Sequence, residues 1–430
     1  MRFGGRISAA IEILSDFEAR RVPLKTAIAD WGRSNRYAGS KDRAFISGLC
    51  LDALRRRASL AATMDDDAPR AVILAALRFL WKTSLEDVAA AVTEEHGPGA
   101  LTEKEHEALS AERLAEAGDT PEWLTPHLTR VFGERAASVM KAFSERADID
   151  LRLNTLKTTP EKAVAALKTV KAEASPLLQT AARIAAPEPS EKAPGVTVIP
   201  AFNKGWVEVQ DLGSQLAASA AGEIKGAQVL DYCAGGGGKT LALAAMMENT
   251  GQLYAYDRDA RRLKPLFDRA KRAGVRNVQI RSPAGGEGLD DLAAKMDVVF
   301  VDAPCTGAGT WRRHPDTKWR LTEKQLQTRQ GEQDTVLKEA SRFVKPGGRM
   351  VWVTCSFLME ENEDRLAAFL ETHGDFSRAP ALSFIEQSGL STEEGKTALS
   401  ACVTPDGAIR LTPDKIRADG FFVAVMTRRT

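Results

Sequence analysis

Two cysteines stand at the ends of short apolar segments, where a thiol can take part in covalent chemistry. Cys305 follows the β-branched run 298–301, and Cys355 follows the run 350–353. Runs of this kind predict buried strands of a parallel sheet, and ligands bind at the carboxyl edge of such sheets. Asp302 closes the first run. We therefore expect two thiols and a carboxyl group at one catalytic edge.

A lone cysteine is more often a small buried hydrophobe than a nucleophile. We give that interpretation to Cys50, Cys233 and Cys402. The chain has five cysteines and no CxxC pair, which excludes a secreted disulfide scaffold and a structural zinc site. His314 has no companion ligands at metal spacing, so we expect no metal.

A glycine-rich loop follows an expected strand over 228–233. Residues 235–238 are all glycine and Lys239 follows, so the backbone can approach a ligand closely where a helix begins. A Walker phosphate loop would require glycine at position 233, which is cysteine. Asp257 closes the next expected strand, 251–256, where an acid can bind a ribose. The loop indicates a ribose-bearing cofactor, either NAD or S-adenosylmethionine.

Three parts can be drawn along the chain. Residues 1–145 predict an all-helical domain, because apolar residues recur at helical spacing in segments such as 7–17 and 45–54. Residues 146–205 predict a small α+β, RRM-like module with a strand near 150–156, a helix over 160–168 and a strand over 196–199. Residues 206–430 alternate strand and helix, which predicts a Rossmann-like α/β domain. Its expected strands are 228–233, 251–256, 277–281, 297–302, 348–355 and 420–426.

The amino-acid composition indicates the class of protein to which the chain belongs. The 430 residues are 43% apolar and 27% charged, as in ordinary globular proteins. We find no signal peptide and no apolar run of membrane-spanning length, so we expect a cytoplasmic protein with no membrane partner. The net charge of +1 gives no general sign of nucleic-acid binding, which must rest on local clusters.

Two basic clusters are candidates for RNA contact. The run 55–57 is all arginine and follows Arg33, Arg36, Lys41 and Arg43. A solvated helix surface and an RNA-facing patch are equally open interpretations of it. The second cluster is interleaved with Trp311 and Trp319, a mixture that suits phosphate contact and base stacking, although such tryptophans are as often part of a core. Its cations are Lys239, Arg312, Lys318 and Arg320.

The cysteine motifs and the glycine loop together make residues 206–430 resemble the RNA cytosine-5 methyltransferases of the RsmB/Sun (NOL/NSUN-related) family. The resemblance lies in the motifs 231–240, 302–305, 312–319, 354–356 and 360–362, and in the flanking motifs 152–156 and 209–211. Residues 1–145 resemble the NusB-like RNA-binding domain often fused to this family, through 41–45.

The resemblance implies S-adenosylmethionine as cofactor and RNA as substrate. It implies that the Cys355 thiolate adds to carbon 6 of cytosine, that Asp302 contacts ring nitrogen 3, and that Cys305 assists breakdown of the adduct. Lys239, Arg312, Lys318 and Arg320 would contact the RNA. The implied cofactor residues are Asp231, Cys233, Ala234, Gly235, Gly236, Gly237, Gly238, Lys239, Asp257, Arg258 and Asp302.

The chain departs from the family pattern at two places. Gly236 stands where the family usually has proline, and 281–285 lacks the acid that contacts adenine. We expect a monomeric enzyme acting on 16S ribosomal RNA. The alternatives are a tRNA cytosine-5 methyltransferase and a non-catalytic RNA-binding or ribosome-assembly factor. An NAD-dependent oxidoreductase would leave the paired cysteines unexplained, and an amino-group methyltransferase would end its fourth strand in Pro-Pro-aromatic.

Overall fold

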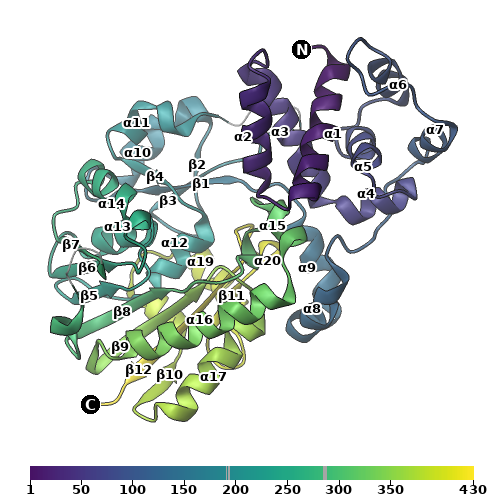
Figure 1. Cartoon of the computed structure of the whole chain (residues 1–430). Helices are drawn as coiled ribbons and strands as arrows, with labels where there is room; N and C mark the ends of the chain where they lie inside the picture. Colours follow the sequence, from purple (N-terminus) through teal and green to yellow (C-terminus); the bar gives the residue numbers. More distant parts are fainter. Residues whose placement is uncertain (190, 192–193, 284–287) are drawn as a thin grey trace. The chain divides into compact units, whose positions relative to one another are not determined.

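The computed structural model describes all residues except 190, 192–193 and 284–287, so parts of the segments 187–195 and 281–285 lie outside the described residues. Contacts divide the chain into two units (Figure 1). The first is helical and contains Met1–Arg146 and Trp311–Leu321, with a short stretch that begins at Ala186. The second contains Ala147–Ala185, Pro194–Thr310 and Thr322–Thr430.

The helical unit forms because its segments are amphipathic at helical spacing. Ile7, Ile13, Leu14 and Phe17 are buried on one face of the first helix, as the sequence predicts. Side-chain caps start several helices; Thr102, for example, accepts a hydrogen bond from the Glu105 amide at 3.1 Å. The helices are α1 Phe3–Arg20, α2 Leu24–Ser34, α3 Ser40–Arg55, α4 Arg57–Met64, α5 Pro69–Ala75, α6 Leu85–Val92, α7 Glu103–Leu109, α8 Thr125–Phe132, α9 Ala136–Phe143 and α15 Pro315–Arg320.

A small antiparallel sheet begins the second unit, with strand order β2-β3-β1-β4. Its elements are β1 Ile149–Leu153, α10 Pro160–Ala166, β2 Glu173–Ala174, β3 Ala181–Ile184, α11 Pro200–Asn203 and β4 Val207–Val209. The prediction of a strand over 196–199 is wrong. Val196–Val198 forms a 3₁₀ turn that buries Val196 in the core of the module and leaves Val198 77% exposed, so the segment contributes to the core without joining the sheet. The fourth strand, which pairs with β1, instead begins at Val207, beyond the limit of 205 that the sequence suggested.

The large sheet carries the Rossmann-like fold and has the order β10-β12-β9-β8-β5-β6-β7, with β11 paired to β12. Pairing is parallel from β9 to β7 and antiparallel for β10, β11 and β12. Each strand expected from the apolar runs is present. The strands are β5 Gln228–Asp231, β6 Gln252–Tyr256, β7 Val278–Arg281, β8 Met296–Asp302, β9 Val344–Thr354, β10 Phe376–Ala379, β11 Ile409–Leu411 and β12 Phe421–Arg428.

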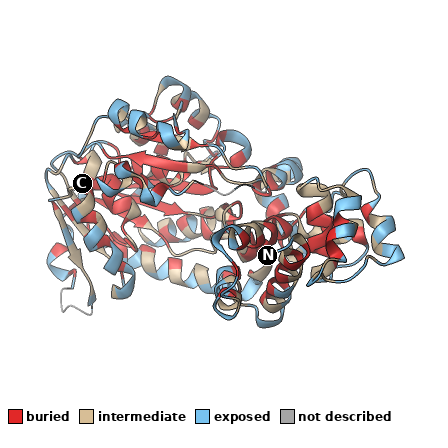
Figure 2. Ribbon diagram, turned by 90° about the horizontal axis from the view of Figure 1, so that it is seen from above, coloured by how far each residue is buried: buried red, intermediate tan, exposed pale blue. Residues whose placement is uncertain are grey.

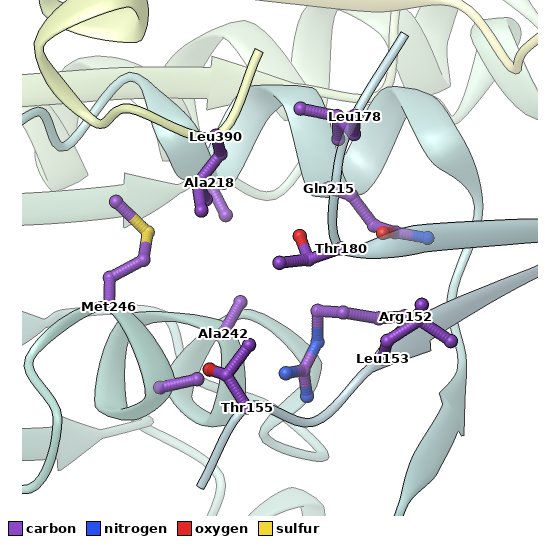
Figure 3. Close-up of a pocket in the computed structure, with 11 residues that line it drawn as sticks. Arg152, Leu153, Thr155, Leu178, Thr180, Gln215, Ala218, Ala242, Met246 and Leu390 are labelled. Carbon is purple, nitrogen blue, oxygen red and sulfur yellow. The ribbon is translucent and has the colours of Figure 1, made fainter. Parts of the chain in front are cut away.

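Helices cover this sheet and expose one side to solvent, while the strands are largely buried (Figure 2). They are α12 Leu212–Ser219, α13 Gly238–Met246, α14 Ala260–Ala273, α16 Glu323–Ser341, α17 Glu363–Thr372, α18 Ala381–Gln387, α19 Glu393–Ser400 and α20 Pro413–Ile416. The strands β6 and β7 are added on one side of β5, and β8 and β9 on its other side. Open α/β sheets bind ligands at the point where the strand order switches in this way. Among the described helices, none has both the length and the apolar character that crossing a membrane requires.

Candidate active site

The structure brings the two motif cysteines together. Strands β8 and β9 are parallel neighbours, with Asp302 paired to Val353, so the residues that follow them emerge side by side. The Ala303 amide donates to the Val353 carbonyl at 2.8 Å and holds the two strand ends in register. The Sγ atoms of Cys305 and Cys355 lie 3.3 Å apart. This separation places both thiols within reach of one bound base.

The two thiols differ in their surroundings. The hydrogen bond with Cys355 and then burial raise the pKa of Cys305 well above its ordinary value. Cys305 is therefore a protonated thiol near neutral pH, and once deprotonated it is a strong base. An acid–base role and a nucleophilic role can thus be divided between two neighbouring sulfur atoms.

A buried carboxyl group, Glu361, organises the loop that carries Cys305. Its Oε1 accepts the Thr306 amide at 2.7 Å, and its Oε2 accepts the Thr306 hydroxyl at 2.6 Å. The Gln333 amide group donates both to Glu361 at 3.1 Å and to the Pro304 carbonyl at 2.9 Å. Burial raises the pKa of Glu361. Sequence analysis identified Glu361 only as part of the motif 360–362, and no sequence signal indicates Gln333, which lies on α16.

Cys355 is fixed from its other side by a polar turn. The Thr354 hydroxyl donates to the Asn362 side-chain oxygen at 2.6 Å, and the Asn362 amide group donates to the Ser356 carbonyl at 3.0 Å. All three residues are fully buried. Buried polar groups that satisfy one another in this way form a rigid unit, so the position of the Cys355 sulfur is defined by the packing around it.

Lys239 joins the cofactor loop to the catalytic edge. Its Nζ donates to Asp302 Oδ2 at 2.7 Å and lies 5.1 Å from the centre of the Phe421 ring. Burial lowers the pKa of Lys239, but the charge and hydrogen bond of Asp302 together with the charges of Cys355 and Asp231 outweigh burial, so the pKa is raised overall. The pair is a charged ion pair, and the lysine ammonium that we expected at RNA phosphate is bonded to the candidate catalytic acid.

The loop after β5 has the character of a cofactor site. Asp231 is fully buried; its Oδ2 accepts the Thr240 hydroxyl at 2.6 Å, whereas its Oδ1 has no hydrogen-bond partner. Burial raises the pKa of Asp231 to about 7. An oxygen atom that is buried without a hydrogen-bond donor destabilises the fold unless a ligand donates a hydrogen bond to it. This orphaned oxygen therefore fits a loop that receives a polar ligand.

Asp257 shapes the same loop from β6. Its Oδ2 accepts the Gly235 amide at 3.0 Å, and its Oδ1 accepts the Asp259 amide at 2.9 Å. Gly237 has φ of 83°, and a Cβ there would lie 2.2 Å from Leu266 Cδ1, so only glycine fits. The glycine loop without side chains and the Asp257 carboxylate thus lie next to each other, an arrangement that suits a ribose-bearing cofactor.

The other residues expected at the cofactor lie along this loop or beside it. Cys233 is half-buried, and burial raises its pKa well above the ordinary value. Ala234 is buried, and its amide donates to the Tyr256 carbonyl at 2.9 Å. Gly236 accepts a hydrogen bond from Arg269. Arg258 is exposed. Whether any of them contacts the cofactor stays a prediction.

Three residues expected to contact RNA belong to the helical unit. Arg312 and Lys318 are each 2% exposed. Arg55 donates to the Arg312 carbonyl at 2.8 Å, and the Lys318 ammonium donates to the Arg55 carbonyl at 3.2 Å. Arg320 lies 3.4 Å from Asp316. The Arg312 side chain donates to the Arg146 carbonyl at 3.0 Å. The bonds with Arg55 join the segment 312–318 to α3, and a phosphate contact by the Arg312 or Lys318 side chain would require its bond to a carbonyl to break.

Burial of Lys318 has a measurable electrostatic consequence. Burial lowers its pKa from 10.5 to about 7. Its Nζ lies 5.1 Å from the centre of the Trp319 ring, and the Trp319 indole donates to the Leu54 carbonyl at 2.6 Å. Trp311 is 1% exposed. Both tryptophans of this cluster thus pack within the helical unit instead of forming an open stacking platform.

The basic run 55–57 is likewise paired inside the helical unit. Arg55 lies 2.5 Å from Asp52, Arg56 2.7 Å from Asp119 and Arg57 2.7 Å from Glu18. Asp52 is only three residues from Arg55, but Asp119 and Glu18 are far from their arginines in the sequence, so local charge could not indicate those two pairs. The pairing favours the interpretation of this run as packed helix surface. In the described part of the chain, no group of three His, Cys, Asp or Glu side chains is placed to hold a metal ion.

Comparisons with known proteins show which family the chain belongs to. A family model described as 16S rRNA methyltransferase RsmB/F matches residues 222–427, and a model of the RsmF/B-like ferredoxin-like domain matches residues 120–191. The ribosomal RNA small subunit methyltransferase B of Klebsiella pneumoniae is 30% identical over 334 residues, covering 76% of this chain and 70% of that protein. The chain belongs to the RsmB/F methyltransferase family. It is therefore an RNA methyltransferase, and its methyl donor is S-adenosylmethionine.

Other relatives give the same assignment. The enzyme of the same name from an Enterobacter species is 32% identical over 271 residues, 60% of this chain and 61% of that protein, so the match leaves more than a third of that relative uncovered. The crystal structure of a methyltransferase homologue from Pyrococcus horikoshii is 28% identical with a TM-score of 0.57, covering 72% of this chain and 95% of that one. Known proteins thus match both the methyltransferase domain and the α+β module of this RsmB/F family member.

Proposed function

We propose that this enzyme methylates carbon 5 of a cytosine in RNA through a covalent adduct, and that its substrate is 16S ribosomal RNA. The observation that carries the proposal is the 3.3 Å approach of Cys355 and Cys305 beside the Asp302–Lys239 ion pair. Methyl transfer to a ring nitrogen or an amino group would not use two thiols.

The chemistry follows from the weakness of carbon 5 as a nucleophile. The Cys355 thiolate bonds to carbon 6, and nitrogen 3 takes up the displaced electron pair together with a proton delivered through Asp302, whose carboxylate the Lys239 ammonium balances. Carbon 5 can then accept a methyl group, after which it must lose its hydrogen as a proton. Cys305, after releasing its own proton to solvent, takes the proton from carbon 5. The electron pair of that C–H bond restores the ring double bond, the bond between carbon 6 and Cys355 breaks to restore the Cys355 thiolate, and nitrogen 3 returns its proton.

S-adenosylmethionine supplies an electrophilic methyl group on a sulfonium centre. The residues that fit it are Asp231, with its unpartnered buried oxygen, the bare backbone of Gly235–Gly238, and Asp257. We place the ribose at Asp257 because a carboxylate can accept both hydroxyls. The reducing cytoplasm suits an enzyme with free catalytic thiols, and we place the protein there as a monomer.

One gel tests the mechanism. RNA labelled at its end and incubated with S-adenosylmethionine should stay attached to the Cys305→Ala variant through denaturing electrophoresis, because elimination stalls after methyl transfer. Cys355→Ala should yield neither methylated RNA nor a complex. Cys402→Ala, which alters a buried thiol of the core, is the matched control and should behave as the unaltered enzyme. A trapped complex on Cys355→Ala instead would reverse the two roles.

The same assay separates the alternatives. Transfer to 16S rRNA fragments but not to tRNA transcripts supports the proposed substrate, and the opposite preference would make the protein a tRNA cytosine-5 methyltransferase. Absence of transfer to any RNA would favour a non-catalytic ribosome-assembly factor. We favour ribosomal RNA because the relatives that match over most of the chain are named for it.

A further inference from the structure

An open hollow lies within the second unit. The residues that line it are far in the sequence from Cys305 and Cys355. It has a volume of about 570 Å³, and Lys157, Lys204, Trp206, Lys271 and Arg272 line it. Lys157 follows β1, Lys204 and Trp206 lie between α11 and β4, and Lys271 is on α14. Nothing in the site described above accounts for this hollow.

The two walls of the hollow are fixed to each other. The Asn154 amide group donates to the Gly205 carbonyl and to the Ala273 carbonyl, each at 2.8 Å. A Cβ at Gly205 would lie 2.0 Å from the Arg272 carbonyl oxygen, so the small module and α14 meet backbone to backbone. The hollow is therefore a preformed feature, and binding there needs no rearrangement of the backbone.

The lysines around the hollow are not neutralised by the protein. Lys157, Lys204 and Lys271 are exposed, and within the described residues none of them has an ion-pair partner. Arg272 is paired with Glu208, and Asp268 is the one acid in the lining. By contrast, all three arginines of the run 55–57 are paired. In a chain of net charge +1, this excess of uncompensated positive charge is local.

Aromatic side chains accompany these cations. Trp206 is half-buried, and Lys204 Nζ lies 5.0 Å from the centre of its ring. On the outer face of α14, Phe267 is 60% exposed, with Lys264 three positions before it and Lys271 four positions after it. Lysines alternating with open aromatic rings suit single-stranded nucleic acid, whose phosphates pair with cations and whose bases stack.

We propose that the hollow and the outer face of α14, which together we call the lysine surface, bind a single-stranded segment of the RNA substrate that flanks the target cytosine. This inference rests on the proposed function. At its other end α14 contacts the cofactor loop, since Arg262 lies 3.0 Å from Asp257. From Arg262 to Lys271 the helix rises about 14 Å, so the hollow at the far end of α14 holds flanking nucleotides and not the reacting base.

The test compares two triple variants by the salt dependence of RNA binding. Lys157→Gln, Lys204→Gln and Lys271→Gln together should lower the log–log slope for a single-stranded RNA that includes the target by about 2, at about 0.7 per lost phosphate contact. The control carries Lys162→Gln, Lys324→Gln and Lys338→Gln, three exposed lysines elsewhere in the same unit, and should keep the slope of the unaltered protein. Equal slopes for the two triple variants would overturn the inference.

Kinetics and stacking give independent readouts. The lysine-surface variant should raise KM for RNA about tenfold or more while kcat at saturating RNA stays unchanged, and Phe267→Ala should weaken single-strand binding about tenfold. A loss of kcat with no change in KM would place these lysines in the catalytic step and overturn a docking role. If the unaltered enzyme methylates no RNA, the proposed function fails, while the slope comparison still decides whether this surface binds RNA.

Discussion

Truncating Glu361 should damage both the stability of the protein and its rate of methyl transfer. In Glu361→Ala the Thr306 amide loses its 2.7 Å partner, the Thr306 hydroxyl loses its 2.6 Å partner, and Gln333 keeps only its bond to Pro304. One buried donor left unpaired costs about 1–3 kcal/mol, and a lost bond to a charged acceptor about 1.5–3 kcal/mol. Because the Thr306 hydroxyl can turn to water, we expect the free energy of unfolding to fall by about 2–4 kcal/mol, measured by urea denaturation.

The rate should fall because the same bonds position Cys305. A displacement of about 1 Å at a reacting group can cost about 100-fold, so kcat for Glu361→Ala should fall about 10- to 100-fold, measured with labelled S-adenosylmethionine. Glu361→Gln keeps an acceptor for the Thr306 amide and should recover most of the rate. Glu371→Gln changes an exposed acid on α17 and serves as control. The reasoning is refuted if Glu361→Ala keeps the unaltered rate and stability, or if the glutamine variant is as impaired as the alanine variant.

Two further predictions concern the cofactor loop and the helical unit. Asp257→Ala should weaken S-adenosylmethionine binding by about 1–3 kcal/mol in a titration, through loss of charge-assisted hydrogen bonds, whereas Asp259→Ala should change it little. Lys318→Met should make the protein about 2–4 kcal/mol more stable at pH 6. The reason is that the folded-state pKa of Lys318 is about 7 against 10.5 ordinarily, so below pH 7 the fold carries the full penalty of a buried ammonium. As pH rises from 7 toward 10.5 the folded protein loses this proton first, so the gap should close by about pH 10; a constant gap in thermal or urea unfolding would contradict the assignment.

The large sheet could be predicted because its strands are continuous apolar runs. The segments ending at Asp302 and Thr354 are buried on both faces, and burial of that kind leaves a clear local pattern. Because both runs were predicted to be parallel strands of one sheet, Cys305 and Cys355 could be predicted to lie at the same edge. Their contact distance and the contribution of Gln333 could not be predicted, because they depend on how α16 packs against the strand ends.

Predictions based on charge were less successful than those based on apolar patterns. The motif that contains Arg312 and Lys318 predicts an exposed cationic surface, but both side chains are buried. Their partners, Arg55 and Arg146, are more than 160 residues away, so no window of sequence could reveal the pairing. The lysines at positions 157, 204 and 271 are also far from one another in the sequence, and only the fold shows that they line one hollow.

The pairing of β12 with β9 has a consequence for how the catalytic edge is assembled. Cys355 directly follows β9, and β12 pairs with β9 over Phe422 to Thr427. Phe421 also lies over the Lys239 ammonium, and the Gly420 amide donates to the Gly309 carbonyl at 2.7 Å in the segment after Cys305. The thiol, the acid and the glycine loop therefore reach their positions only when β12 has joined the sheet. Folding of β12 and assembly of the catalytic edge are one cooperative event.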